Sequence, residues 1–256
     1  MSWNPFKRND APRRSVISKS AEREFERDVK KLEELDECGK KLNKDTKRCI
    51  ENSGTLVKTE LKLSQDLTQS SLYQTDEQFK MLTDDWAHAI TRLDLLTQEK
   101  NAVHTKTMVE PLKKFSSIFP GMRAAVKKRE SSLQEYTRCQ EKVDRYRERE
   151  RTGPNIVKLE QSKKALTVAK EDFETQNQIL REDLPRLYEG RIDFFEPCFQ
   201  ALIKTQVTYF TEAHKIYSEL SGKMTSEKDL LLDDSYENQL DNKLSEIRSL
   251  SIIADD

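Results

Sequence analysis

The sequence predicts an all-α protein made of a few long helices packed as an antiparallel coiled-coil bundle. Two features of its composition indicate this. Of its 256 residues, 35% are hydrophobic and 36% are charged, whereas globular domains average about 45–50% and about 25%. Glycine (6) and proline (7) together supply only 13 residues for turns, which is few for a sheet or a compact α/β fold. Such a chain buries narrow apolar seams and exposes charge elsewhere.

The composition also excludes several kinds of active site. All six glycines are isolated, so no glycine-rich loop can cradle a phosphate. The three histidines have no spacing typical of metal ligands. We therefore expect no enzyme, no catalytic residue, no metal and no cofactor.

Cysteine usage and hydrophobic runs bear on the cellular compartment. The four cysteines form no Cys-x-x-Cys pair, which is typical of reduced thiols in a cytosolic chain. No apolar run exceeds three residues, so we expect no membrane-spanning helix. Any contact with a membrane must then be peripheral.

Residues 1–19 are expected to form a flexible basic arm. Pro5 and Pro12 interrupt any helix there, and residues 1–20 hold five basic residues against one acid. Two aromatic rings lie beside two cations, which predicts a shallow, optional membrane anchor made of Trp3, Phe6, Lys7 and Arg8.

The first helix is expected at about 20–69. It carries an apolar seam at strict seven-residue spacing, made of Leu35, Leu42, Cys49, Leu56 and Leu63. Gly39 and Gly54 weaken this helix without breaking it.

Two longer helices are expected at about 76–151 and 155–221, separated by a turn at Gly153-Pro154. Their apolar residues recur in alternating steps of three and four, which is the helical period. The second helix carries Phe79, Leu82, Trp86, Ala89, Leu93 and Leu96, then Val126, Leu133, Tyr136 and Val143. The third carries Phe195, Phe199, Leu202, Tyr209, Ala213, Ile216 and Leu220.

Four prolines fall inside these two helices, and each should kink its helix. Pro120 and Pro111 precede Gly153 by 33 and 42 residues, while Pro185 and Pro197 follow it by 32 and 44. Paired kinks at matching heights predict a hairpin that curves as a unit. The alternative is that each proline adjusts helix packing independently.

Charge is distributed unevenly along the chain. Residues 122–170 hold 14 Lys and Arg against 7 Asp and Glu, whereas the tail at 223–256 is acidic. Steps of four, three and four place Arg138, Lys142, Arg145 and Arg149 on one helix face. The candidate binding surface adds basic residues from both sides of the turn: Lys127, Lys128 and Arg129, then Lys158, Lys163 and Lys164.

Several short motifs, in their order and spacing, resemble one protein family over nearly the whole chain. They are Phe119-Pro120-Gly121-Met122 leading into Val126-Lys127-Lys128-Arg129, and Leu184-Pro185-Arg186-Leu187-Tyr188. The chain thus resembles the BAR domains of amphiphysins and bridging integrators. The resemblance assigns residues 20–222 to a BAR domain, with the acidic tail following it.

The resemblance implies a crescent-shaped antiparallel homodimer whose lysines and arginines bind anionic, curved membrane. It also implies a cytoplasmic scaffold linked to the actin cytoskeleton, to Rho-family GTPases such as Cdc42, and to cell division by cytokinesis. The low apolar content independently favours a dimer in which central seams pair, including Trp86, Leu93 and Phe199.

Two other functions compete with this hypothesis. A coiled-coil cytoskeletal tether would have the same helices without touching lipid, and its basic residues would be incidental. Nucleic-acid binding is weakly supported, because no aromatic residues interleave with the basic stripe and the net charge is −1.

Overall fold

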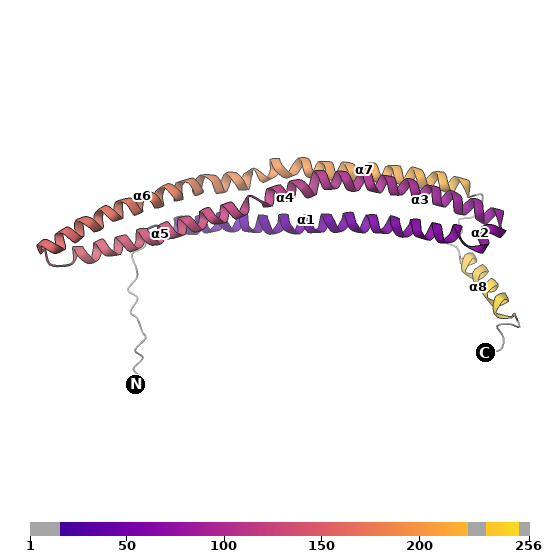
Figure 1. Ribbon diagram of the computed structural model, residues 1–256, viewed down its shortest axis with the longest axis horizontal. Helices are drawn as coiled ribbons and strands as arrows, with labels where there is room; N and C mark the ends of the chain where they lie inside the picture. The colour runs from indigo at the N-terminus through magenta and orange to yellow at the C-terminus, as the bar shows by residue number, and fades with distance from the viewer. Residues whose placement is uncertain (1–15, 225–233, 251–256) are drawn as a thin grey trace, which may run out of the picture. The chain divides into compact units, whose positions relative to one another are not determined.

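A computed structural model describes residues 16–224 and 234–250, and these residues form helices without any strand (Figure 1). The prediction of an all-α fold of long helices is confirmed. The helices, in chain order, are α1 (Lys19–Thr68), α2 (Ser71–Thr75), α3 (Glu77–His104), the π-helix η1 (Thr105–Val109), α4 (Glu110–Ser116), α5 (Phe119–Arg147), α6 (Gly153–Glu189), α7 (Arg191–Lys223) and α8 (Asp234–Arg248). The candidate anchor residues Trp3, Phe6, Lys7 and Arg8 lie outside the described residues.

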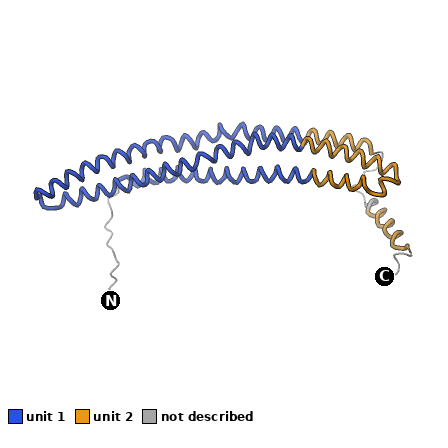
Figure 2. Tube along the Cα trace, in the orientation of Figure 1, with its two compact units in different colours: residues 1–56, 97–209 blue, residues 57–96, 210–256 orange. Residues whose placement is uncertain are grey.

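The chain divides into two compact units (Figure 2). Unit 1 comprises residues 1–56 and 97–209, and unit 2 comprises residues 57–96 and 210–256. Because α1, α3 and α7 contribute to both units, each unit contains segments that are distant in sequence.

Unit 1 is held by an apolar core between α1, α4, α5 and α6. Its rings meet edge to face, with the Phe115 centroid 5.4 Å from Phe119 and 4.7 Å from Phe195, an arrangement that adds to the free energy of burial. The core consists of Phe25, Leu32, Phe115, Phe119, Met122, Val126, Leu180 and Leu184.

Unit 2 has a separate core between α1, α3 and α7. Its buried residues are Val57, Ala89, Ile90, Leu93, Ala213, Ile216 and Leu220. Two ion pairs flank it: Arg92 with Glu219, and Lys223 Nζ with Asp85 Oδ1 at 2.6 Å. Both pairs are exposed, so each contributes little to stability.

The second predicted helix is not continuous. After α3 the backbone widens into η1, where the amide of Glu110 bonds to the carbonyl of Thr105. Pro111 then lies in the first turn of α4, where its missing N–H is tolerated, and Pro120 lies in the first turn of α5. Pro185 and Pro197, by contrast, lie inside α6 and α7.

A buried polar cluster adjoins η1 in unit 1. The Lys100 ammonium lies 4.1 Å from the centroid of the Tyr209 ring, and Thr97 Oγ1 lies 3.2 Å from the Tyr209 hydroxyl. His104 is 1% exposed, and no described group bonds to its Nε2. Burial lowers the pKa of Lys100, while burial and the charge of Lys100 both lower the pKa of His104.

This burial predicts that acid destabilises the fold through His104. Its folded pKa lies below the ordinary value of 6.5, so below about pH 6.5 the unfolded chain binds a proton that the folded chain does not. The free energy of unfolding should therefore fall as pH decreases from 7 to 5, with a slope approaching about 1.4 kcal/mol per pH unit. Urea unfolding at several pH values measures this slope.

The variant His104→Leu should flatten the slope between pH 7 and 5. The control is His214→Leu, which alters an exposed histidine in α7 and should leave the slope unchanged. An unchanged slope in His104→Leu would show that another group causes the acid sensitivity.

Candidate functional site: the basic surface of unit 1

Helices α5 and α6 form the antiparallel pair that carries most of the predicted basic residues. Arg129 bonds to Asn177, Ser132 bonds to Asp172, and the Tyr136 ring stacks on Phe173 with centroids 5.9 Å apart. In this register the residue numbers of facing positions add up to about 306. Lys164 therefore lies level with Lys142, and the two predicted basic groups lie along neighbouring helices.

Most of the predicted binding residues are exposed. Lys142 is half-buried, Arg129 is buried, and eight are exposed: Lys127, Lys128, Arg138, Arg145, Arg149, Lys158, Lys163 and Lys164. Two of the eight have acidic neighbours on their own helix, since Arg138 lies 3.6 Å from Glu135 and Lys163 lies 2.7 Å from Glu160. Such exposed pairs are weak, so both cations can be shared with an external anion.

The prediction that Arg129 belongs to the binding surface is wrong. Its side chain is 1% exposed and donates two hydrogen bonds to the Glu22 carboxylate, at 2.8 and 2.7 Å, and one to Asn177. Its guanidinium also lies 3.8 Å from the centroid of Phe25 and 5.3 Å from that of Phe173. The hydrogen bonds from Arg129 hold the pKa of Glu22 below its usual value.

The helical period explains the difference between Arg129 and its two basic neighbours. Val126, Arg129 and Leu133 follow one another in steps of three and four, so Arg129 occupies a position in the apolar seam of α5. Lys127 is two residues earlier and projects about 160° away. A run of adjacent basic residues on a helix is therefore distributed around it.

A second buried charge joins α5 to α1. The side chain of Asp36 is 1% exposed, and its Oδ2 accepts from Lys40 Nζ at 2.6 Å and from Arg123 Nη1 at 2.9 Å. Burial raises the pKa of Asp36, but the bonds from Lys40 and Arg123 outweigh burial and hold it below the ordinary value. Together with the Arg129–Glu22 pair, this interaction fixes α1 beside α5.

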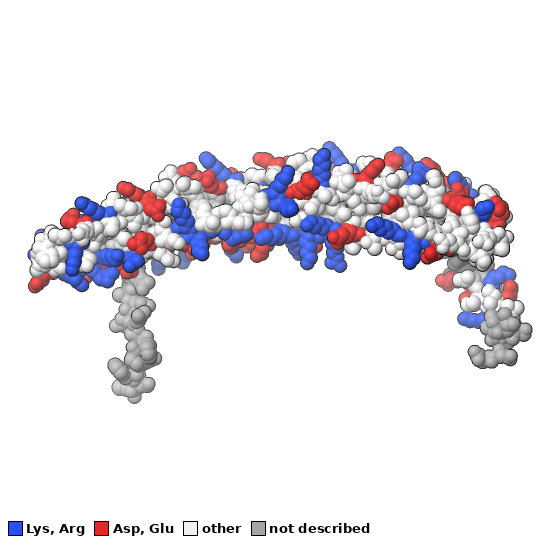
Figure 3. Space-filling view, in the orientation of Figure 1, with Lys and Arg blue, Asp and Glu red and all other residues white. Residues whose placement is uncertain are grey.

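The sequence analysis missed a basic segment of α1. Its cations are exposed and follow one another at helical spacing: Lys41, Lys44, Lys47 and Arg48. In Figure 3, Lys and Arg side chains gather along the lower edge of unit 1, over both α5 and α1. The local sequence Lys-Lys-Leu-Asn-Lys-Asp-Thr-Lys-Arg could have revealed this segment, but the charge balance was compared only over longer regions.

Unit 1 also has an exposed apolar surface formed by α1 and α7. A groove of about 520 Å³ is lined by both helices and by Leu112 of α4; its apolar residues include Leu35, Leu42, Ile192, Phe195, Phe199 and Ile203. Ile203 and Val207 of α7 are each 61% exposed, as is Leu56 of α1. Apolar surface of this kind on a soluble protein indicates an interface.

The seven-residue seam of α1 is largely absent from the cores of the two units. Leu35 and Leu42 are half-buried and Cys49 is exposed, while Leu63, like Leu56, is more than half exposed. The fully buried apolar residues of α1 are instead Phe25, Leu32 and Val57. The seam is therefore a surface feature of this chain.

The three residues predicted to form the centre of the dimer differ in exposure. Phe199 is 39% exposed and lines the groove of unit 1. Trp86 is half-buried against the core of unit 2, whereas Leu93 is 3% exposed within that core. Leu93 is thus already covered by its own chain, which makes it an unsuitable contact residue.

Comparison with known sequences identifies the family. A sequence profile of the BAR domain matches residues 18–226. The chain belongs to the BAR domain family. It is 43% identical to "Bridging integrator 3" of Mus musculus and 41% identical to that of Homo sapiens, in both cases over the full length of both chains. The predicted family membership is confirmed.

Fungal proteins and solved structures extend the similarity. The "Regulator of cytoskeleton and endocytosis RVS161" of Candida albicans is 24% identical over 98% of each chain. The structure of the "Amphiphysin BAR domain from Drosophila" covers 80% of this chain and 94% of its own, with a TM-score of 0.66 and 22% identity. This structural likeness establishes the BAR fold of long kinked helices.

Two searches of the described residues found no matching feature. No helix there has both the length and the apolarity needed to cross a bilayer. No group of three or more potential metal ligands occurs among those same residues.

The buried position of Arg129 predicts a large difference between two neighbouring variants. Arg129→Ala removes a charge buried against two rings and leaves Glu22 and Asn177 without their partner, so the free energy of unfolding should fall by about 3–5 kcal/mol. Lys128→Ala, at an exposed site, should change it by less than about 0.5 kcal/mol. Urea unfolding followed by circular dichroism compares the two, and equal small effects would contradict the buried role of Arg129.

Proposed function

We propose that this BAR domain is a non-enzymatic peripheral membrane scaffold, which acts as a homodimer and binds or senses curved anionic bilayers. The observation that carries the proposal is the set of exposed cations that α5, α6 and α1 place on unit 1. Each Lys or Arg near an anionic surface contributes about 1 kcal/mol, so four to six per chain suffice for reversible binding, and a dimer doubles the number.

The proposed binding surface uses three groups of residues. From α5 it takes Lys127, Lys128, Arg138, Lys142, Arg145 and Arg149, and from α6 it takes Lys158, Lys163 and Lys164. The α1 segment from Lys41 to Arg48 extends it. The N-terminal arm would add a shallow anchor through its two aromatic rings.

The exposed apolar surface of α1 and α7 supports a homodimer. A second copy that covered the groove near Phe199 and Ile203 would remove these side chains and the α1 seam from water. Homodimers are usually symmetric, so the same surface would serve both chains. The crescent shape of the dimer is part of the proposal, since it would present both basic surfaces to one curved bilayer.

A link to the cytoskeleton is the second part of the proposal. The name of the Candida albicans relative includes both cytoskeleton and endocytosis, and this chain is similar to that relative along nearly all of its length. We therefore propose a cytoplasmic role at membranes where actin is organised, including cytokinesis, with a Rho-family GTPase of the Cdc42 type as a candidate partner.

The competing function is a cytoskeletal tether without lipid contact. A tether has no need of a cationic surface, and exposed lysines without acidic partners would be incidental in it. Vesicle binding separates the two functions directly, because a tether should pellet with neither anionic nor neutral vesicles.

Reversing charge on the proposed surface should weaken vesicle binding. Lys127→Glu/Lys128→Glu should lose more than tenfold in affinity for vesicles containing phosphatidylserine, because four charge units change beside the anionic lipid. Lys44→Glu/Lys47→Glu should have a similar effect through α1. Salt at about 0.5 M should mimic both variants, since it shortens the reach of surface charge to a few Å. Co-sedimentation measures the bound fraction.

The matched control is Lys204→Glu/Lys215→Glu, which changes the net charge equally at exposed positions of α7. It should bind nearly as well as the unmodified chain. Equal loss in the control would show that net charge rather than a defined surface governs binding. A chain that does not pellet with anionic vesicles would support the tether.

A charge in the apolar groove should dissociate the dimer. The unmodified chain of 30.0 kDa should sediment as a dimer of about 60 kDa at micromolar concentration, because the exposed apolar surface is covered. Ile203→Asp should shift it towards the monomer. Val168→Asp, at a 67% exposed position of α6 outside the groove, should remain dimeric. A monomeric unmodified chain would contradict the proposal.

A further inference from the structure

Helix α8 carries an apolar stripe that no part of the chain covers. Leu240, Leu244 and Ile247 are 56%, 40% and 51% exposed, and their spacing places them on one face of the helix. A helix of 15 residues is only marginally stable alone in water, because most helical stability in proteins comes from packing of the apolar face. The stripe therefore requires a surface to cover it.

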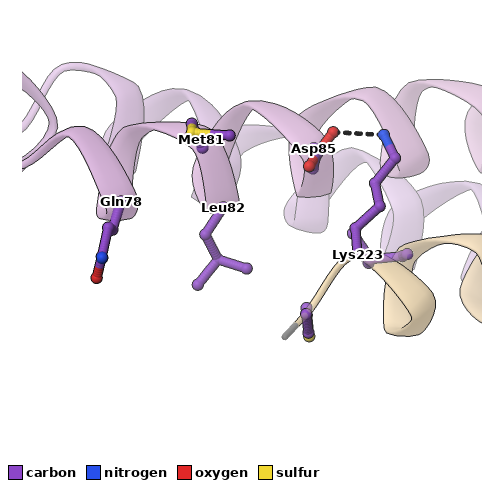
Figure 4. Close-up of a pocket in the computed structure, with 7 residues that line it drawn as sticks. Gln78, Met81, Leu82, Asp85 and Lys223 are labelled. Carbon is purple, nitrogen blue, oxygen red and sulfur yellow. Dashed lines mark hydrogen bonds and ion pairs between the residues drawn. The ribbon is translucent and has the colours of Figure 1, made fainter. Parts of the chain in front are cut away.

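Unit 2 contains a groove of suitable character between α3 and the end of α7 (Figure 4). Its volume is about 490 Å³, and it is lined by Gln78, Met81, Leu82, Asp85, Leu220, Lys223 and Met224. Leu220 is buried, whereas Met81, Leu82 and Met224 are 63%, 46% and 47% exposed. The ion pair between Asp85 and Lys223 lies beside these apolar side chains.

The connection between groove and helix is short. Met224, at the end of α7, lines the groove itself, and α8 begins at Asp234. The nine intervening residues can span at most roughly 35 Å. Such a tether gives α8 an effective concentration of about millimolar at the groove, so even weak contacts would keep it docked.

Charge favours this occupant over a membrane. The sequence of α8 holds four acids and two bases, so an anionic bilayer would repel it. Glu237 and Asp241 lie on one flank of the apolar stripe, and Lys223 at the groove keeps 56% of its side chain exposed. An acidic flank and an exposed ammonium are complementary.

We propose that α8 docks in this groove of its own chain, with Leu240, Leu244 and Ile247 packed against Met81, Leu82 and Met224. Docking adds a fourth helix to unit 2 and attaches the acidic tail to the end of α7. Methionine side chains suit such a contact, since they adapt to the shape of an apolar partner. The inference does not depend on membrane binding.

The test uses the full chain without lipid. Docking should slow hydrogen exchange of the α8 amides by about tenfold relative to an undocked peptide of residues 234–250. It should also slow oxidation of Met81 and Met224 by hydrogen peroxide, because covered thioethers react more slowly. Mass spectrometry measures both rates.

Variants on either side of the contact should have reciprocal effects. Leu244→Asp should raise oxidation of Met81 and Met224 severalfold, and Leu82→Asp should raise exchange in α8 to the peptide rate. The control Asn242→Asp adds the same charge on the opposite face of α8 and should change neither rate. Slow exchange of the Ile90–Leu96 amides shows that unit 2 remains folded in each variant.

Three outcomes would overturn the proposal. Protection of α8 only when vesicles are added would make the membrane its partner. Protection that disappears on dilution would indicate a second copy of the chain. Protection of Met81 and Met224 that depends on Leu230, Leu231 and Leu232, and not on Leu244, would indicate that these leucines fill the groove instead.

Discussion

The buried guanidinium of Arg129 is the interaction on which unit 1 depends most. It joins three helices, since it bonds to Glu22 of α1 and Asn177 of α6 from its own position in α5. A buried charge without partners would cost several kcal/mol, so the three helices can pack only in the register that satisfies it. That register in turn sets which residues of α5 and α6 face water. The exposed cations are therefore arranged by a buried one.

The protein divides its apolar residues between two uses. Phenylalanine, leucine and valine at some positions of α1 form the cores of the units, while the seven-residue seam of the same helix remains at the surface. The basic residues are divided similarly: Arg123 and Lys40 stabilise Asp36, whereas Lys127 and Lys128 have no acidic partner among the described ion pairs. A chain with 35% hydrophobic residues cannot cover every apolar stripe by itself. This shortage makes association with another surface part of the fold's energetics.

The fold class and family could be predicted from the sequence, because composition, helical period and the motifs around Pro120 and Pro185 all indicate the same architecture. The environment of single residues could not. Arg129 follows two exposed lysines and differs from them only in its angle around α5, and Leu93 belongs to the same period as Trp86. Periodicity shows that a face is apolar, but the neighbouring helix that covers it is known only in three dimensions. Likewise, nothing in the sequence before Pro111 indicates that the widened turn falls at Thr105–Val109.

The π-helix has a consequence for how the length of this region can vary. A π turn holds about one residue more than an α turn, so η1 accommodates a residue that a regular α-helix would not. Loss of one residue there could restore regular α-helix, but it would rotate every later side chain by about 100° relative to α3. Phe115, Phe119 and Arg129 would leave the interior together, and lysines would turn inward. The region is therefore expected to tolerate substitutions more readily than insertions or deletions, since its residue count sets the phase of α4 and α5.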